Sequence, residues 1–286
     1  MRNKCKKLSK WTFSGFVILV LGTLVNVFLS MKWLKIRRVD AVIDNLPREL
    51  LGLRILHITD LHNNSYSKMN VNIWKKVFEE DFDIACITGD LTVFKFEQIL
   101  PHKAYLQALA KRVPVFFVDG NHEKKHFFRM KRFLQGIGIT VLDGRKVKID
   151  INGYPLEILG IRDYYYQEHY NFRPFYKLMK NEEHKEFRLL LSHQPQIVKK
   201  CGAFTDIFIM SGHTHAGQLR LPFFPVIGAP GQGFWPKYGA GFYKVGGNYL
   251  YVSQGIGASR IQARFFNRPE VSIIRLNKGV NGLRKV

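Results

Sequence analysis

The chain has 286 residues, 46% of them hydrophobic, and its 44 Lys and Arg outnumber its 22 Asp and Glu, giving a formal net charge of +22. This length accommodates one folded domain with a sizeable core, and neither a linker-like stretch nor a fixed-period repeat divides it. The three cysteines show no CxxC spacing, so they indicate neither a disulfide framework nor a zinc knuckle.

An uncharged run near the N-terminus predicts a membrane anchor. Residues 11–31 contain no Asp, Glu, Lys or Arg, and as a helix they would span about 31 Å, close to the hydrocarbon thickness of a bilayer. No small-residue cleavage pattern ends the run, so an uncleaved signal anchor is expected rather than a signal peptide. We therefore predict a basic start and one transmembrane helix in residues 1–40, followed by one domain over residues 41–286.

The charges around this run bear on the side of the membrane that the domain occupies. Five basic residues precede the run and four follow it. This balance favours a cytoplasmic N-terminus and an extracytoplasmic domain in a single-pass membrane protein.

Short apolar strands alternate with helices in the first half of the domain. After residue 139 most segments have strand character, apart from a largely helical stretch at 163–186 and a long loop with short strands at 221–247. Two packed sheets flanked by helices, an α/β fold, are expected. The predicted strands are 53–59, 83–88, 114–118, 147–151, 156–161, 187–192, 206–211, 249–252 and 271–276, and the predicted helices of the first half are 71–80, 98–111 and 124–135.

Residue types that bind metals recur just after five of these strands. The carboxyl ends of neighbouring strands in an α/β sheet meet at one edge, so the side chains that follow them should form one cluster. The cluster comprises two Asp, one Asn and five His: Asp60, His62, Asp90, Asn121, His122, His193, His213 and His215.

Oxygen ligands combined with imidazoles suit transition metals such as Mn, Fe or Zn better than Mg or Ca alone. Eight such residues exceed the needs of one ion and suffice for two ions about 3.5–4 Å apart. Such a pair polarises a phosphoryl oxygen and supplies hydroxide near neutral pH. The sequence therefore predicts two divalent metal ions as cofactors.

The ordered set D-x-H (60–62), G-D (89–90), G-N-H-E (120–123), H (193) and G-H-T-H (212–215) resembles the calcineurin-like metallophosphoesterase family. The ending G-H-T-H-A-G-Q (212–218), with G-I-G at 255–257, is similar to a membrane-anchored bacterial branch of that family. This resemblance implies a four-layer αββα sandwich of two mixed β-sheets flanked by helices.

The same resemblance implies a role for each residue of the cluster. Some family members pair the catalytic His with an Asp three residues after the bridging one, but Val93 stands there, which leaves the partner of that His open. The implied roles are a first metal site of Asp60, His62 and His215, a second of Asn121, His193 and His213, a bridging Asp90, and a catalytic His122 that protonates the leaving oxygen.

The function expected from these observations is hydrolysis of a phosphoester or pyrophosphate bond by a metal-bound hydroxide. Residues 41–286 keep 35 Lys and Arg against 21 Asp and Glu, which leaves +14. A positive surface suits anionic lipid, and with the anchor it favours a phosphorylated, lipid-linked or envelope-associated substrate. A nuclease-type phosphodiesterase acting on nucleic acid is the alternative enzyme. A non-catalytic membrane-bound scaffold is a further alternative, although no metal ligand of the pattern is lost.

Overall fold

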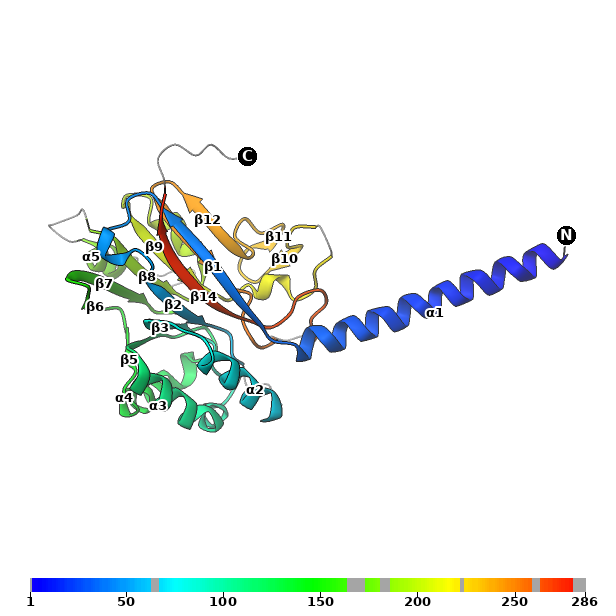
Figure 1. Ribbon diagram of the computed structural model, residues 1–286, viewed down its shortest axis with the longest axis horizontal. Coiled ribbons are helices and arrows are strands. Elements are labelled where there is room, and N and C mark those ends of the chain that lie inside the picture. The colour runs from blue at the N-terminus through cyan, green and yellow to red at the C-terminus, as the bar shows by residue number, and fades with distance from the viewer. Residues whose placement is uncertain are drawn as a thin grey trace.

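The computed structural model describes residues 2–62, 67–163, 173–180, 186–221, 224–258 and 263–279, and within them the chain forms two six-stranded sheets (Figure 1). The first sheet has the order β1-β14-β2-β3-β4-β5 and the second β12-β13-β9-β8-β7-β6. Both are mixed, because β14 runs antiparallel to β2 and β6 antiparallel to β7 among otherwise mostly parallel neighbours. The strands of the first sheet are β1 (Lys35–Ile43), β2 (Arg54–Ile58), β3 (Ile84–Thr88), β4 (Val115–Val118), β5 (Thr140–Val141) and β14 (Glu270–Lys278). Those of the second are β6 (Lys146–Ile151), β7 (Tyr154–Ile161), β8 (Arg188–Ser192), β9 (Ile207–Ser211), β12 (Gly241–Val245) and β13 (Asn248–Val252).

Alternate side chains of the central strands face two different cores. In β3, Cys86 packs between the two sheets and Ile87 packs under the helices. In β8, Leu191 packs between the sheets and Leu190 lies in a third cluster on the outer face. Because successive side chains of a strand point to opposite faces, strands that are apolar throughout require cover on both sides.

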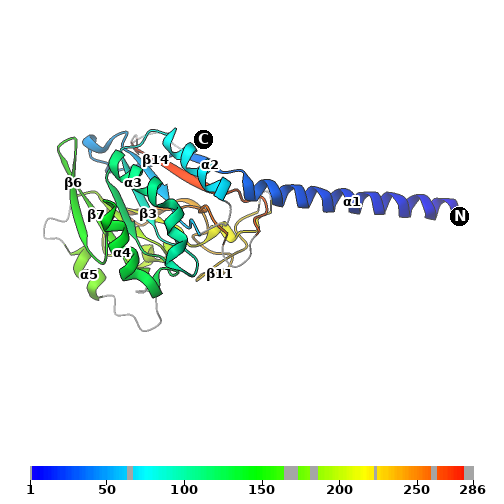
Figure 2. The same ribbon diagram turned by 90° about the horizontal axis from the view of Figure 1, so that it is seen from below.

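Helices provide that cover. The helices α2 (Ser67–Phe78), α3 (Lys103–Arg112) and α4 (Phe127–Gly136) lie together on one side of the molecule (Figures 1 and 2), and their buried side chains join the core of the first sheet. On the outer face of the second sheet, Phe175 and Met179 of α5 (Arg173–Met179) are buried in the third cluster. The three clusters separate four layers, and the predicted α/β fold with two mixed sheets is confirmed.

Most predicted elements are present with small shifts at their ends. The predicted helices at 98–111 and 124–135 each begin with a 3₁₀ segment, Phe96–His102 and Lys124–His126, before α3 and α4. Within 221–247 the short strands are β10 (Gly228–Ala229), β11 (Gly233–Phe234) and β12. Of the stretch predicted at 163–186, residues 164–172 and 181–185 lie outside the described residues.

The helix α1 (Arg2–Lys32) projects away from the sheets in Figure 1. Across the described residues, no helix combines the length and the apolar character that a membrane crossing needs. The predicted transmembrane helix and single-pass membrane location are therefore wrong. The prediction rested on the absence of charge, and the run also contains polar Asn26 and Ser30, whose side chains are 3.2 Å apart. Asn26 Oδ1 also accepts a hydrogen bond from the backbone N–H of Phe266, which ties the helix to the domain.

Strand β1 was not predicted, and the predicted boundary at residue 40 falls inside it. It pairs in parallel with β14 from Lys35 opposite Glu270 to Ile43 opposite Lys278, so residues 35–40 belong to the first sheet.

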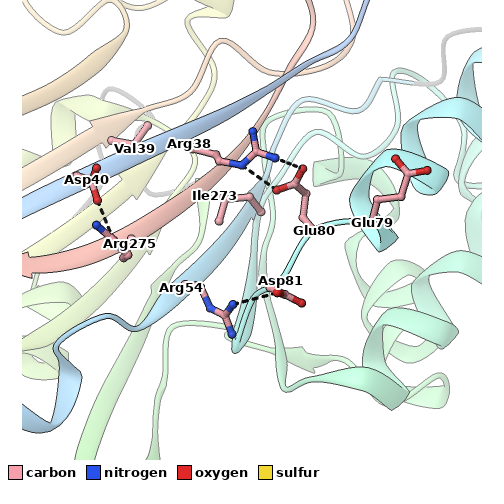
Figure 3. Close-up of a pocket in the computed structure, with 9 residues that line it drawn as sticks. All are labelled: Arg38, Val39, Asp40, Arg54, Glu79, Glu80, Asp81, Ile273 and Arg275. Atoms are coloured by element: carbon pink, nitrogen blue, oxygen red, sulfur yellow. Dashed lines mark hydrogen bonds and ion pairs between the residues drawn. The ribbon is translucent and has the colours of Figure 1, made fainter.

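Beside β1 lies a cavity of about 440 Å³ (Figure 3). Its lining carries ion pairs, Arg38 with Glu80 at 2.6 Å and Arg275 with Asp40 at 2.9 Å. None of the residues that line it belongs to the predicted metal cluster.

Candidate metal centre

The eight predicted residues lie at one edge, where strands of both sheets end. β2, β3 and β4 run parallel in the first sheet, as do β8 and β9 in the second, so their carboxyl ends face the same way within each sheet. The structure brings all eight residues into one cluster, in which each has a polar side-chain atom within 3.8 Å of one on another member.

The backbone of this cluster is strained. The φ angle is positive at five of the eight: Asp60 (51°), His62 (36°), Asp90 (53°), His213 (69°) and His215 (49°). Each such residue costs on the order of 1–3 kcal/mol and persists only where the surroundings fix it. Here the loops after β2 and β3 fix each other, because the backbone N–H groups of Asp60 and His62 donate to the carbonyl oxygens of Gly89 and Asp90, both at 3.0 Å.

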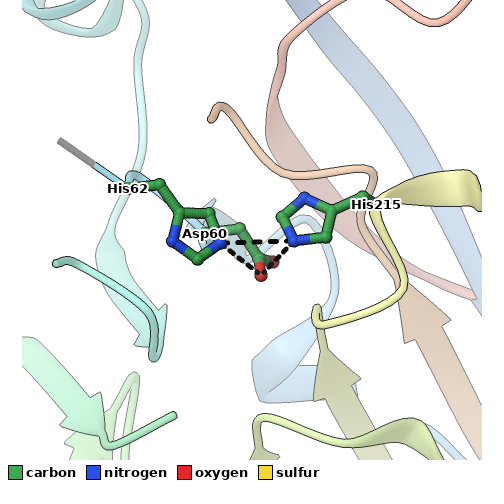
Figure 4. Close-up of side chains that lie close together, drawn as sticks. All are labelled: Asp60, His62 and His215. Atoms are coloured by element: carbon green, nitrogen blue, oxygen red, sulfur yellow. Dashed lines mark hydrogen bonds and ion pairs between the residues drawn. The ribbon is translucent and has the colours of Figure 1, made fainter. Parts of the chain in front are cut away.

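One group of ligand-type side chains consists of Asp60, His62 and His215 (Figure 4). The Nε2 atoms of the two histidines lie 3.2 Å apart, and Asp60 Oδ1 lies 3.7 Å from His62 Nε2 and 3.4 Å from His215 Nε2. All three residues are buried. Their ligand atoms lie within 4.8 Å of one another, an arrangement that suits one metal ion.

A second group consists of Asp90, His193 and His213. Asp90 Oδ2 lies 3.2 Å from His193 Nε2, which in turn lies 3.0 Å from His213 Nδ1. Asn121 Oδ1 lies 3.2 Å from the same His193 nitrogen. Asp90 Oδ2 is also 3.6 Å from His62 Nε2, so this carboxylate lies between the two groups.

His122 approaches the cluster from the outside. Its Nε2 is 3.8 Å from Asp90 Oδ2, and its Nδ1 is 2.7 Å from the carbonyl oxygen of Val93. A carbonyl oxygen can only accept, so Nδ1 carries a proton and, in the neutral ring, Nε2 is the free nitrogen. The partner that the sequence left open is therefore a backbone atom of Val93, which no side-chain pattern could reveal.

A model of the calcineurin-like phosphoesterase family matches residues 53–217, more than half of the chain. The chain belongs to this family. The matched segment contains all eight residues of the cluster. Family membership and the clustered His and Asp side chains together make the chain a metal-dependent phosphoesterase.

Similar proteins occur in two bacteria and in a mammal. The uncharacterized metallophosphoesterase YkoQ of Bacillus subtilis is 30% identical over 80% of this chain and 85% of its own length. The phosphodiesterase YaeI of Escherichia coli is 28% identical over 78% of this chain and 82% of its own length. A Bos taurus transmembrane protein with metallophosphoesterase domain is 25% identical over 94% of this chain and 63% of its own length. Because similarity extends to a mammalian protein, assignment to a membrane-anchored bacterial branch is not confirmed.

The chemistry of the cluster fits divalent metal ions. Asp60 Oδ1 is buried between two imidazoles and has no hydrogen-bond partner among the described residues, as expected of an atom that binds a cation. Burial lowers the pKa of His62 and holds the pKa of His215 well below its usual value. It also lowers the pKa of His213 to about 3. These imidazoles are therefore neutral, the form that coordinates a metal.

The two carboxylates respond differently to their surroundings. Burial raises the pKa of Asp60. Burial also opposes the charge of Asp90, but the imidazoles around it, His193 first, outweigh this effect and hold its pKa below the usual value. Asp90 is therefore the carboxylate that stays ionised at the centre of the cluster.

Glu123 belongs to the G-N-H-E motif but had no predicted role. Its buried carboxylate accepts backbone hydrogen bonds from Asp90 at 2.8 Å, Gly120 at 2.9 Å and Thr92 at 3.0 Å. These contacts join the loops after β3 and β4. The loops are so close that a Cβ atom on Gly120 would lie 2.6 Å from the Asp90 nitrogen.

Proposed function

We propose that this chain hydrolyses a phosphodiester bond with two divalent metal ions bound side by side. The observation that supports two ions is the sharing of residues between ligand groups. His62 belongs to the group around Asp60 and to a group with Asp90 and His122, and Asp90 also belongs to the group around His193. A chain of overlapping groups suits two neighbouring ions with a shared carboxylate.

In this proposal Asp60, His62 and His215 hold one ion, and Asn121, His193 and His213 hold the other, with Asp90 between them. Bound Mn, Fe or Zn ions would polarise the phosphoryl oxygen and lower the pKa of water at the site. The protein's contribution is to fix the ligands, and the mutual hydrogen bonds of the strained loops support that role.

His122 is proposed to donate a proton to the leaving oxygen. Its Nδ1 proton is engaged by Val93, so a protonated ring has its second proton on Nε2, the nitrogen nearer to Asp90. His122 also remains partly exposed, with 21% of its side chain accessible, so that a substrate can reach it. A general acid in this position contributes roughly 10²–10⁴ in rate.

The phosphodiester class is favoured over monoesters by the relative from Escherichia coli that is named a phosphodiesterase. The positive charge of the domain suits an anionic substrate of this kind. Nucleic acids and lipid-linked phosphates both contain such bonds, and a substrate panel separates them.

The full chain, stripped with a chelator and reloaded separately with Mn²⁺, Fe²⁺ or Zn²⁺, tests the proposal. Activity should return only with metal, at a ratio of two ions per chain. The specificity constant should be higher for bis(p-nitrophenyl) phosphate than for p-nitrophenyl phosphate or inorganic pyrophosphate. A preference for either of the latter would contradict the phosphodiester assignment, and full activity at one ion per chain would contradict the second site.

A further inference from the structure

The side chain of Gln98 fixes the turn that contacts His122. Its Oε1 atom accepts hydrogen bonds from the backbone N–H groups of Val93 at 2.9 Å and Phe94 at 3.0 Å, and more weakly from Lys95 at 3.3 Å. One amide oxygen thus serves three successive residues of the turn between β3 and the 3₁₀ segment at Phe96–His102.

The contact of Phe94 with Gln98 and the contact of Val93 with His122 share one peptide unit. The carbonyl oxygen of Val93, which accepts from His122 Nδ1 at 2.7 Å, and the N–H of Phe94, which donates to Gln98, belong to the same peptide plane. A trans peptide is rigid, and its C=O and N–H point in opposite directions. Holding the N–H on the Gln98 side therefore aims the carbonyl at His122.

We propose that Gln98 is a positioning residue for His122 and acts through the peptide unit that joins Val93 to Phe94. The inference rests on the proposed role of His122 as proton donor. With Nδ1 engaged, the ring is held with Nε2 toward the cluster, where it lies 3.8 Å from Asp90 Oδ2. The backbone N–H of His122 also donates to Asp90 Oδ1 at 3.0 Å, so the residue is fixed at both its main chain and its ring.

A simpler role for Gln98 is as a helix cap. Lys95 is the N-cap residue of the 3₁₀ segment, and its backbone N–H donates to the side chain of Gln98, which is one of the two contacts of a capping box. Such a contact stabilises the start of a helical segment. A cap alone changes stability, whereas a positioning residue changes the reaction in a way that depends on His122. The two roles therefore differ in how their loss combines with loss of His122.

The test compares three single variants in the metal-loaded full chain. Gln98→Leu removes the acceptor, Gln98→Glu keeps it, and Gln107→Leu makes the same chemical change at an exposed position of α3. The turnover number is measured on a diester with a poor alkyl leaving group and on bis(p-nitrophenyl) phosphate. Gln98→Leu should lower turnover of the alkyl ester about tenfold and that of the nitrophenyl ester much less, since a small displacement of a catalytic group can cost this much. Gln98→Glu should recover most of the loss, and Gln107→Leu should resemble the parent protein.

A double-mutant cycle decides between positioning and capping. In a His122→Ala background, Gln98→Leu should change turnover of the alkyl ester by less than about twofold, because there is no ring left to position. A full tenfold loss in that background, or equal losses on both substrates, would overturn the inference. If Gln98→Leu does not fold, Gln98→Asn, whose side chain is one methylene shorter, takes its place.

The cycle also separates this inference from the proposed function. If His122→Ala itself affects both substrates equally, the proton-donor role fails and the inference fails with it. If His122→Ala discriminates between the substrates and Gln98→Leu does not, only the inference fails.

Discussion

Asp90 Oδ2 lies 3.2 Å from Nε2 of His193, although the two residues follow strands of different sheets. The contact therefore exists only when the two sheets are packed against each other. His193 has a second contact with the first sheet, because its Nδ1 lies 2.7 Å from the carbonyl oxygen of Thr88 in β3. Metal binding and packing of the two sheets should consequently stabilise each other.

The first prediction concerns Asp90→Asn. This change should lower the occupancy of both metal sites and reduce activity by at least about 10², since the shared carboxylate also lies near ligands of both groups. Metal analysis of the purified protein and steady-state kinetics measure the two effects. Asp81→Asn, which makes the same change at a side chain that is 81% exposed, is the control. Asp90→Asn protein that retains two ions would argue against a bridging carboxylate.

The second prediction concerns His122→Ala. Both ions should remain bound, because His122 is proposed to act on the leaving group. Turnover of a poor leaving group should fall by roughly 10²–10⁴. The loss should be small for a nitrophenyl ester, whose leaving group scarcely needs a proton. Metal analysis and kinetics on both esters test this, and loss of one ion would instead identify His122 as a ligand.

The third prediction compares two glycines. A Cβ atom at Gly120 would collide with the carboxylate of Asp90. At Gly136, the last residue of α4, a Cβ atom would meet nothing within 4 Å among the described residues beyond its chain neighbours and its own helix backbone. Gly120→Ala should therefore lower both metal occupancy and the midpoint of thermal unfolding. Gly136→Ala should leave metal occupancy unchanged and alter stability by less than about 1 kcal/mol. Metal analysis and a melting curve distinguish them, and equal behaviour would mean that the loops after β3 and β4 can move apart without loss.

The fourth prediction concerns the pH dependence of stability. Burial lowers the pKa of His102 to about 4, and its Nδ1 accepts a hydrogen bond from Trp74 Nε1 at 3.0 Å. In the unfolded chain the same ring titrates near 6.5. The unfolded state therefore binds more protons between these values, and the contribution of His102 to stability, complete above pH 6.5, is lost as pH falls toward 4.

His102→Asn keeps an acceptor near the Trp74 N–H and removes the titration. Relative to this variant, the parent protein should lose up to about 1.4 kcal/mol of unfolding free energy per pH unit between pH 6.5 and 4. Urea unfolding at several pH values measures the difference, and the comparison cancels the titration of all groups common to both proteins. Parallel curves would show that His102 is not buried in its neutral form.

The central strands and the cluster were predictable because their signals are local. The strand Ile84–Thr88 is buried along its whole length and apolar up to Ile87, and Asp90 stands two residues after its end. Strand β1 was missed because exposed and half-buried basic residues such as Arg37 and Arg38 resemble the flank of an apolar run. Its partner β14 lies at the other end of the chain, beyond the reach of any local pattern.

The atoms that hold the site in place could not be predicted from the sequence, for a different reason. The partner of His122 is the carbonyl oxygen of Val93, and a backbone atom leaves no trace in residue identity. The signal for Glu123 was present in the G-N-H-E motif, but its contacts are to the backbone of loops that meet only in the folded protein. Sequence thus identifies residues whose side chains do chemistry more readily than those that hold loops in place.

The fifth prediction concerns the division between the N-terminal segment and the domain. Residues 35–40 supply six of the nine residues of β1 that pair with β14. They include Arg37, whose Nη1 lies 3.4 Å from Oε2 of the fully buried Glu270. A chain beginning at residue 41 loses these pairs and leaves the buried Glu270 without its contact to the partly exposed Arg37. Loss of a hydrogen bond between charged groups costs about 1.5–3 kcal/mol.

We therefore expect a chain of residues 33–286 to bind metal and hydrolyse a soluble phosphodiester like the full protein, because every residue of the cluster lies at or beyond Asp60. A chain of residues 41–286 should unfold at a clearly lower temperature. Arg37→Leu in the longer chain isolates the ion pair: it should reproduce part of the loss. The remainder is due to the other missing residues, which include buried Leu34 as well as the strand residues 35–40. Melting curves of the three proteins at equal metal concentration provide the measurement. Equal melting temperatures for the two truncated chains would mean that the first sheet does not need the start of β1.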